Sequence, residues 1–496
     1  MNTTKNNAKS SPSVDRKESG PYNRFGFFLS VLLKQKVCFM TQNDRKAPQL
    51  IRDLTTGSVP GTLLRFAAPL FLSGLLQMVY NMVDMIVVGQ MVGTGGLSAV
   101  SIGGEMMMLI TFIAMGLSNA GQILISRYVG EHRHDRIGDM VATLFTLLMS
   151  LAVIIMFLFL LTYQGIMAWL NTPDSIWEYT RQYVITCIYG TVFIYGYNLV
   201  SAILRGMGDS KHPFMFIAIA SVLNLVLDLL FVGPMQMGPR GAALATVIGQ
   251  GVSFLFALTL LYRHRDQIHF DFKPSHFRIR RTVIRPLLSL GIPMVIQSAA
   301  ITFSMLFVNS YINQYGEVSI AVTGIARKLE NMISIVAQAI SAAGGAMISQ
   351  ALGAKKTERV PKIFFHALWI VAIPSAIFAV ITLLRPEWLF GIFTQDPAVL
   401  QVVLEQYIPV AMIQYLGCTL RPPSFALING SGNSKLNLAV ALLDGVACRI
   451  GLSILLGVTL GWGISGFWYG NAISGCVPFL VGFTFLLSGR WKPKSS

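Results

Sequence analysis

Long apolar stretches constrain the fold of this chain more than any other feature. Residues 141–163, 241–262, 367–384 and 463–488 contain no charged residue. A helix that crosses a bilayer needs about 20 mostly apolar residues, and its backbone groups must be hydrogen-bonded within the protein. With the less uniform stretches included, the sequence predicts twelve spans, at residues 62–89, 98–125, 140–163, 179–203, 213–233, 241–262, 286–312, 320–350, 363–384, 399–420, 435–459 and 463–488. We therefore predict an all-α polytopic membrane protein.

The composition excludes ordinary soluble domains. Only 12% of the 496 residues are charged, whereas a soluble domain usually carries about 25%. The mean hydropathy is +0.60. A net charge of +16 would suggest nucleic-acid binding in a soluble protein, but here the basic residues lie between apolar stretches. We therefore expect the lipid bilayer, and no nucleic acid, as a partner.

The loops between the predicted spans alternate in charge. Basic residues concentrate in every second loop, among them Arg127, Arg133, Arg205, Lys211, Lys355, Lys356, Arg421, Lys435 and several within 263–285. Such loops face the cytoplasm by the positive-inside rule. Because the number of spans is even, both termini are predicted to be cytoplasmic.

The first 60 residues differ in character from the rest. Residues 1–24 are polar and predicted to be disordered. Residues 25–40 are apolar but interrupted by Lys34 and Lys36, so an interfacial amphipathic segment fits them better than a signal peptide. Translation from Met40 is an open alternative. Residues 489–496 are predicted to form a short cytoplasmic tail.

The sequence repeats itself at an offset of about 224 residues. Residues 204–211 align with 428–435, residues 118–126 with 341–349, and Pro69 with Pro293. Six spans per repeat place both repeats in the same orientation, which gives two parallel six-helix repeats. We call residues 61–262 the N-lobe and residues 286–488 the C-lobe, joined by a basic linker at 263–285. Transporters built in this way place the substrate path between the halves and rock them against each other.

Polar residues inside the spans of the N-lobe suggest a functional site. A charged group at the bilayer centre costs about 2.5–3.5 kcal/mol on insertion scales. Asp84 and Asp228 lie well inside spans, and Asn224 lies one turn before Asp228. Spans 1, 5 and 6 carry the polar candidates Gln77, Tyr80, Asn81, Asp84, Asn224, Asp228, Thr246 and Gln250. These residues are predicted to form one buried cluster, with Tyr195 and Asn198 as further candidates for a cavity wall.

Two aspartates that face each other in a dry pocket are predicted to share a proton and to titrate as a pair. The same oxygens, with those of Asn224 and Thr246, could instead ligate Na⁺. A purely structural role, in which these groups only hydrogen-bond helices together, is the alternative. The C-lobe lacks the set, since Val308, Cys448 and Leu452 take the places of Asp84, Asn224 and Asp228.

The C-lobe carries other charges within its spans. Asp444 and Arg449 lie about one turn apart and are expected to neutralise each other rather than to carry ions. Glu330 has Arg327 and Lys328 nearby, and its role stays open. Neither the cysteines nor the histidines show metal-ligand spacing, so no metal cofactor is indicated.

Several short motifs together resemble the multidrug and toxic compound extrusion (MATE) family, over roughly residues 60–488. They lie at residues 68–69, 81–84, 88–89, 97–100, 205–210, 224–228 and 241–246. The resemblance implies a V-shaped bundle of twelve helices that exports cationic organic compounds in exchange for H⁺ or Na⁺. It implies a monomer in the prokaryotic inner membrane, without a cofactor and without enzymatic activity.

The chain is most similar to the DinF-like prokaryotic branch. Asp84, Asn224, Asp228 and Thr246 match the ion-coupling positions of that branch, and Pro69 matches a proline at a helix bend, with Pro293 as its C-lobe counterpart. The NorM-like branch uses acids of the C-lobe, which spans 7 and 10 lack.

A flippase for lipid-linked saccharides is the alternative within the wider superfamily. It would need several basic residues lining the central cavity to hold a pyrophosphate, and few Lys or Arg residues lie deep within the predicted spans. A membrane hydrolase would need a motif such as HExxH or GxSxG, and neither occurs. The choice between H⁺ and Na⁺ and the range of substrates stay open.

Overall fold

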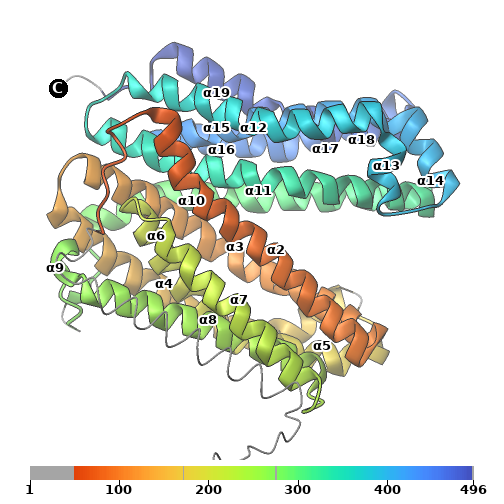
Figure 1. The fold of residues 1–496 in the computed structure, drawn as a ribbon, viewed down its shortest axis with the longest axis horizontal. Coiled ribbons are helices and arrows are strands. Elements are labelled where there is room, and N and C mark those ends of the chain that lie inside the picture. The colour runs from red at the N-terminus through yellow and green to blue at the C-terminus, as the bar shows by residue number, and fades with distance from the viewer. Residues whose placement is uncertain (1–49, 171, 274–275, 494–496) are drawn as a thin grey trace, which may run out of the picture. The chain divides into compact units, whose positions relative to one another are not determined.

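The computed structural model describes residues 50–170, 172–273 and 276–493. The expectations for residues 1–49, including the amphipathic segment and Met40 as an alternative start, lie outside this range. Throughout the described residues the chain is helical, without strands. Figure 1 shows long helices that run side by side along most of the length of the described chain.

Among the described residues, eleven helical segments are long and apolar enough to cross a membrane, and a bent helix pair gives up to twelve spans. In the N-lobe these are α2 (Val59–Val92), α3 (Thr94–Gly130), α4 (His134–Trp169), the pair α5 (Asp174–Tyr189) and α6 (Thr191–Gly206), α7 (Lys211–Val232) and α8 (Gly238–Arg263). The pair bends by 47° at Gly190, where a Cβ atom would lie 2.4 Å from the Val247 side chain. The predicted all-α polytopic fold is confirmed.

The C-lobe repeats this order with more interruptions. Its spans are α10 (Arg281–Ile312), α11 (Glu317–Gly353), α12 (Arg359–Leu384), α14–η3–α15 (Pro397–Ser431), α16–η4–α17–η5 (Ser434–Thr459) and α18–α19 (Gly463–Ser488). The segments η3 (Val403–Tyr407), η4 (Leu443–Cys448) and η5 (Leu455–Thr459) are π-helical. Such π-helical turns are frequent at functional sites. The N-lobe helix that corresponds to the span with η4 and η5 is α7, and it is an uninterrupted α-helix.

The repeated polar motif forms a turn followed by a helix cap in both lobes. Gly208 and Gly432 have φ angles of +88° and +74°, a conformation that glycine adopts without a steric penalty. The next residue caps the following helix: Asp209 Oδ1 accepts from Lys211 N at 3.1 Å, and Asn433 Oδ1 accepts from Leu436 N at 3.1 Å. Local backbone geometry therefore explains the motif.

The first helix of each lobe packs partly into the other lobe. Leu63 and Phe66 of α2 belong to a hydrophobic cluster formed with α11, α12 and α15. Leu287 and Leu290 of α10 belong to the cluster of α3, α4 and α6. The later parts of α2 and α10 pack within their own lobes. In Figure 1, α2 runs from the helices of the C-lobe towards those of the N-lobe. The packing units therefore do not begin where the sequence repeats begin.

Pro69, which matches a proline at a helix bend, and its counterpart Pro293 both lie in these exchanged helices. Pro69 lies within the part of α2 that packs in the C-lobe, since Leu70 also contacts that cluster, and Pro293 lies near the end of the exchanged part of α10. A proline inside a helix removes one backbone hydrogen bond. Each helix is nevertheless continuous through its proline.

The lobes contact each other closely at the end that carries basic loops. A Cβ atom at Gly130 of α3 would lie 2.1 Å from the carbonyl oxygen of Gln350, and one at Gly353 of α11 would lie 2.4 Å from that of Arg127. Ser349 Oγ donates to the Ile123 carbonyl at 2.7 Å. These contacts hold α3 and α11 against each other at this end.

The linker between the lobes is packed rather than free. It contains α9 (Arg265–Ile268), and Phe272 and Phe277 make edge-to-face contacts with Phe145 of α4. Arg280 Nε lies 3.3 Å from Asp139 Oδ1. The described linker residues are therefore anchored on the N-lobe.

Candidate functional site

Two carboxyl groups from different helices meet inside the N-lobe. Asp84 lies on α2 and Asp228 on α7, and their side chains are within hydrogen-bonding reach of each other. Asp228 is fully buried, and its Oδ1 has no hydrogen-bond partner among the described residues. Two carboxyl groups can form such a bond only when one of them carries a proton.

Asn224 and Thr246 complete this cluster. Asn224 lies one turn before Asp228 on α7 and is 3% exposed. With its amide oriented so that both ends are satisfied, Nδ2 donates to Asp84 Oδ1 at 2.9 Å and Oδ1 accepts from Thr246 N at 3.2 Å. The structure thus brings together all four residues for which the sequence predicts ion coupling.

The cluster can perform two kinds of chemistry. A pair of facing carboxyl groups can bind and release one proton as a unit. Alternatively, carboxylate, amide and hydroxyl oxygens are hard ligands of the kind that a sodium ion accepts. Both functions require the pocket to be dry, because bulk water would solvate the carboxylates separately.

The remaining predicted cavity residues are more dispersed. Tyr80 neighbours both aspartates. Gln77 and Gln250 are half-buried, and Asn81 is exposed. Although these residues lie on adjacent helices, they do not together form one cavity wall.

Two candidates on α6 are engaged in the interior of the N-lobe. Tyr195 is fully buried and donates its hydroxyl proton to the Ile110 carbonyl at 2.9 Å. Asn198 Nδ2 donates to the Ile194 carbonyl of its own helix at 2.8 Å. The geometry of both residues matches helix packing rather than the lining of a substrate path.

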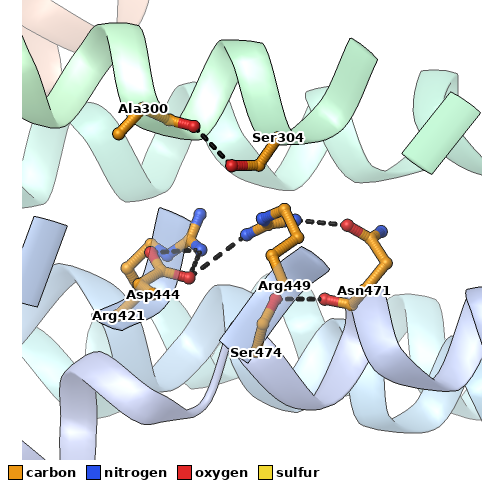
Figure 2. A network of polar contacts seen from close by, with 7 residues as sticks. All are labelled: Ala300, Ser304, Arg421, Asp444, Arg449, Asn471 and Ser474. Atoms are coloured by element: carbon orange, nitrogen blue, oxygen red, sulfur yellow. Dashed lines mark hydrogen bonds and ion pairs between the residues drawn. The ribbon is translucent and has the colours of Figure 1, made fainter. Parts of the chain in front are cut away.

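Sequence reasoning missed a charge network in the C-lobe, which Figure 2 shows. Arg421 was expected in a cytoplasmic loop, but it lies within α15 (Ile408–Ser431). Its guanidinium donates to both oxygens of Asp444, at 3.0 and 2.9 Å. Arg449 donates to Asp444 at 3.3 Å and also to Asn471 of α18. The predicted neutralisation of Asp444 and Arg449 therefore involves a third charge. Two prolines directly after Arg421 suggest a helix end in the sequence, whereas the helix continues through both.

Comparison with known proteins agrees with the architecture and with the repeat. The family model MatE matches residues 69–230 and again residues 293–471, so the two matches begin 224 residues apart. The chain belongs to the MatE family. As a MatE protein it is a membrane transporter and not an enzyme.

Curated relatives and solved structures cover nearly the whole chain. The probable multidrug resistance protein YpnP of Bacillus subtilis is 27% identical over 89% of this MatE protein and 97% of its own length. A MOP superfamily transporter from Pyrococcus furiosus has a TM-score of 0.80 at 23% identity, over 91% of this chain and 100% of that chain. The outward-facing conformation of a multidrug resistance MATE family transporter has a TM-score of 0.81 at 22% identity, with the same coverage of both chains.

Proposed function

We propose that this protein is a multidrug efflux antiporter, which exports cationic organic compounds in exchange for H⁺ or Na⁺. The meeting of Asp84 and Asp228 in a buried part of the N-lobe carries the proposal. A buried acid pair without a compensating cation is costly unless it binds a proton or an ion. The multidrug resistance or export names of several relatives support the substrate class.

The proposed cycle uses alternation of the two lobes. An ion from outside occupies the Asp84–Asp228 pair, the organic cation leaves, and the lobes then open towards the cytoplasm. Ion and substrate shift this equilibrium only through their different affinities for the two states. We assign the hinge to Pro69 and Pro293, because each lies in a helix shared between the lobes. In this scheme the single chain is active as a monomer in the cell membrane, with both termini in the cytoplasm.

The lipid-linked saccharide flippase is less well supported. Arg449 is a buried and Arg421 a half-buried basic residue of the kind that a pyrophosphate would need, but both already donate to Asp444. A flippase would also give no role to the acid pair of the N-lobe. We therefore retain the antiporter as the proposed function.

Efflux from proteoliposomes tests the proposal. We would measure export of rhodamine B ethyl ester, a fluorescent cation, under a pH gradient and a Na⁺ gradient imposed separately. We expect one gradient to drive export, and Asp228→Asn to reduce that export at least about 100-fold, since an amide cannot exchange a proton and is a weak Na⁺ ligand. Asp174→Asn is the matched control, because Asp174 is an exposed acid at the start of α5. Export in the Asp228→Asn variant at the wild-type rate would contradict the proposed coupling site.

A further inference from the structure

A short strap, residues 50–57, leads from one lobe to the other directly before α2. In Figure 1 it is the red coil that runs from the N-lobe helices to the start of α2. Leu50 is 1% exposed and belongs to the hydrophobic cluster of α3, α4 and α6. Its backbone N–H donates to Gln267 Oε1 of α9 at 2.8 Å. Leu54 is 6% exposed and belongs to the cluster of α11, α12 and α15. Between these two leucines the chain therefore changes from the core of one lobe to that of the other.

The N-lobe end of the strap is held by the turn that carries the repeated polar motif. Arg52 N donates to the Met207 carbonyl at 2.8 Å. A guanidinium nitrogen of Arg52 lies 4.0 Å from Asp209 Oδ1. A Cβ atom at Gly208 would lie 2.7 Å from the Arg52 carbonyl oxygen. The glycine therefore allows the backbone of the strap to approach the turn closely.

The equivalent turn of the C-lobe has a different neighbour. A Cβ atom at Gly432 would lie 3.5 Å from a side-chain atom of Arg127, which is an ordinary van der Waals distance. The turn at Gly208 instead meets the backbone of the strap. The repeated motif forms its turn and helix cap in both lobes, so the close fit to the strap is particular to the N-lobe.

The C-lobe end of the strap is bound more extensively and continues into α2. Three side chains of the C-lobe donate hydrogen bonds or accept them there: Gln350, Lys356 and Arg359, which bind Leu54 N, Thr55 Oγ1 and the Gly57 carbonyl at 2.9, 2.8 and 3.1 Å. Leu54 also shares its hydrophobic cluster with Leu63 and Phe66 of α2. If the lobes separate at this end, residues 54–57 therefore move with the C-lobe, and the contacts of Leu50 and Arg52 break.

We propose that Leu50 and Arg52 form a clasp that holds the two lobes together at the end with the basic loops. The clasp is engaged on the turn at residues 207–209 in this structure, and it is released when the lobes open at this end. Because its contacts exist in only one of the two states, it shifts the equilibrium towards that state. The clasp rests on the alternation of the lobes in the proposed function. It adds to that cycle a conformational element outside the ion-coupling cluster.

The population of open molecules tests the clasp without a transport measurement. Spin labels at the exposed positions 133 and 355 report the separation of the lobes, in a background whose native cysteines are replaced. Leu50→Ala removes apolar contacts that only the clasped state makes, so we expect the ratio of long to short distances to rise at least about tenfold. Leu54→Ala is the matched control, because Leu54 is also buried but moves with the C-lobe, and it should leave the ratio at the wild-type level. An unchanged ratio in Leu50→Ala, or an equal rise in both variants, would overturn the clasp.

Reversible cross-links test the clasp in proteoliposomes. Arg52 and His212 both pair with Asp209, so a cysteine at each of these two positions can be joined by a bis-methanethiosulfonate, which a reductant cleaves. We expect the Arg52→Cys/His212→Cys cross-link to stop export of rhodamine B ethyl ester, and the reductant to restore it. The control pair Thr56→Cys/Arg359→Cys ties the strap to the C-lobe, where Arg359 donates to the Thr56 carbonyl, and its cross-link should leave export unchanged. Equal export with both cross-links, or equal loss with both, would contradict the clasp.

The clasp and the proposed function fail separately. If the wild type exports the ester under an ion gradient but the distances do not respond to Leu50→Ala, the antiporter stands and the clasp falls. If the distances respond to Leu50→Ala and not to Leu54→Ala, but the wild type exports the ester under neither gradient, the clasp stands and the proposed function falls.

Discussion

The two lobes share one scaffold but carry opposite buried chemistry. In the N-lobe, Asp84 and Asp228 face each other with amide and hydroxyl neighbours. In the C-lobe, Asp444 lies between Arg421 and Arg449. An acid between two guanidinium groups has its charge balanced by them, whereas two facing acids can bind and release a proton as a unit. Under the proposed function, the N-lobe pair exchanges an ion, whereas the C-lobe cluster holds charge in place.

The helices that carry these groups differ in the same way. Asp228 lies on the uninterrupted α-helix α7, whereas Asp444 lies on the π-helical turn η4 of the equivalent span. The π-helical turn adds a residue to the helical turn and changes the direction of the side chains that follow it. The repeats thus retain their turns, caps and helix order, while the interior residues have diverged.

The largest expected effect is on stability, and it distinguishes the two buried sites. Asp444→Asn removes the acid that both Arg421 and Arg449 bind, so we expect it to lower the free energy of unfolding by about 3–5 kcal/mol. Asp228→Asn removes one of two facing acids and retains a hydrogen-bonding side chain, so we expect a change of less than about 1 kcal/mol. Unfolding of both variants in the same detergent measures the difference. An equal loss of unfolding free energy in the two variants would contradict a structural role for Asp444 that Asp228 lacks.

The second prediction concerns the point where both lobes contribute a glycine. A Cβ atom at Gly130 or at Gly353 would collide with backbone of the other lobe. We expect Gly130→Ala and Gly353→Ala each to destabilise the closed contact by about 1–3 kcal/mol. Spin labels at positions 133 and 355 should then show a larger population of long distances between the labels. Gly104→Ala and Gly324→Ala are the controls, because a Cβ atom at either position would have no neighbour within 4 Å. An unchanged distance in the Gly130 and Gly353 variants would contradict this account of closure.

The smallest expected effect compares the two helix caps. Asp209 bonds to the backbone, pairs with His212 and lies 4.0 Å from Arg52, so Asp209→Asn should cost about 1–2 kcal/mol. Asn433→Asp should change stability by no more than about 0.5 kcal/mol, because Asp and Asn cap helices equally well. Urea unfolding in detergent measures both.

These caps also differ in their dependence on pH. Burial opposes ionisation of Asp209, but the His212 hydrogen bond and the charges of His212 and Arg52 outweigh it and hold the pKa of this carboxyl below its usual value. A carboxyl with a lowered pKa stabilises the fold above its unfolded pKa of about 3.9, and this contribution is lost as the pH falls through the folded pKa. The loss of unfolding free energy on acidification should therefore be smaller in the Asp209→Asn variant than in the wild type. An identical pH profile would contradict the assignment to Asp209.

The sequence alone determined the class of fold, the repeat and the acid pair. A run of about 20 apolar residues has few alternatives to a membrane span, and a charged residue inside one is costly enough to mark a site. For this reason Asp84, Asn224, Asp228 and Thr246 could be named from their positions in the spans, and the structure brings them together. The turn motifs were equally readable, because glycine and a capping residue act locally.

Only the tertiary structure decided which lobe each part of α2 and α10 packs in, and that Arg421 lies inside a helix beside Asp444. It also removed Tyr195 from the candidate cavity wall, since the hydroxyl of Tyr195 is used in the core. These outcomes depend on contacts between residues far apart in the chain. Apolar periodicity shows that a helix is buried in lipid or protein, but it does not specify the partner, because lipid and protein interiors are equally apolar.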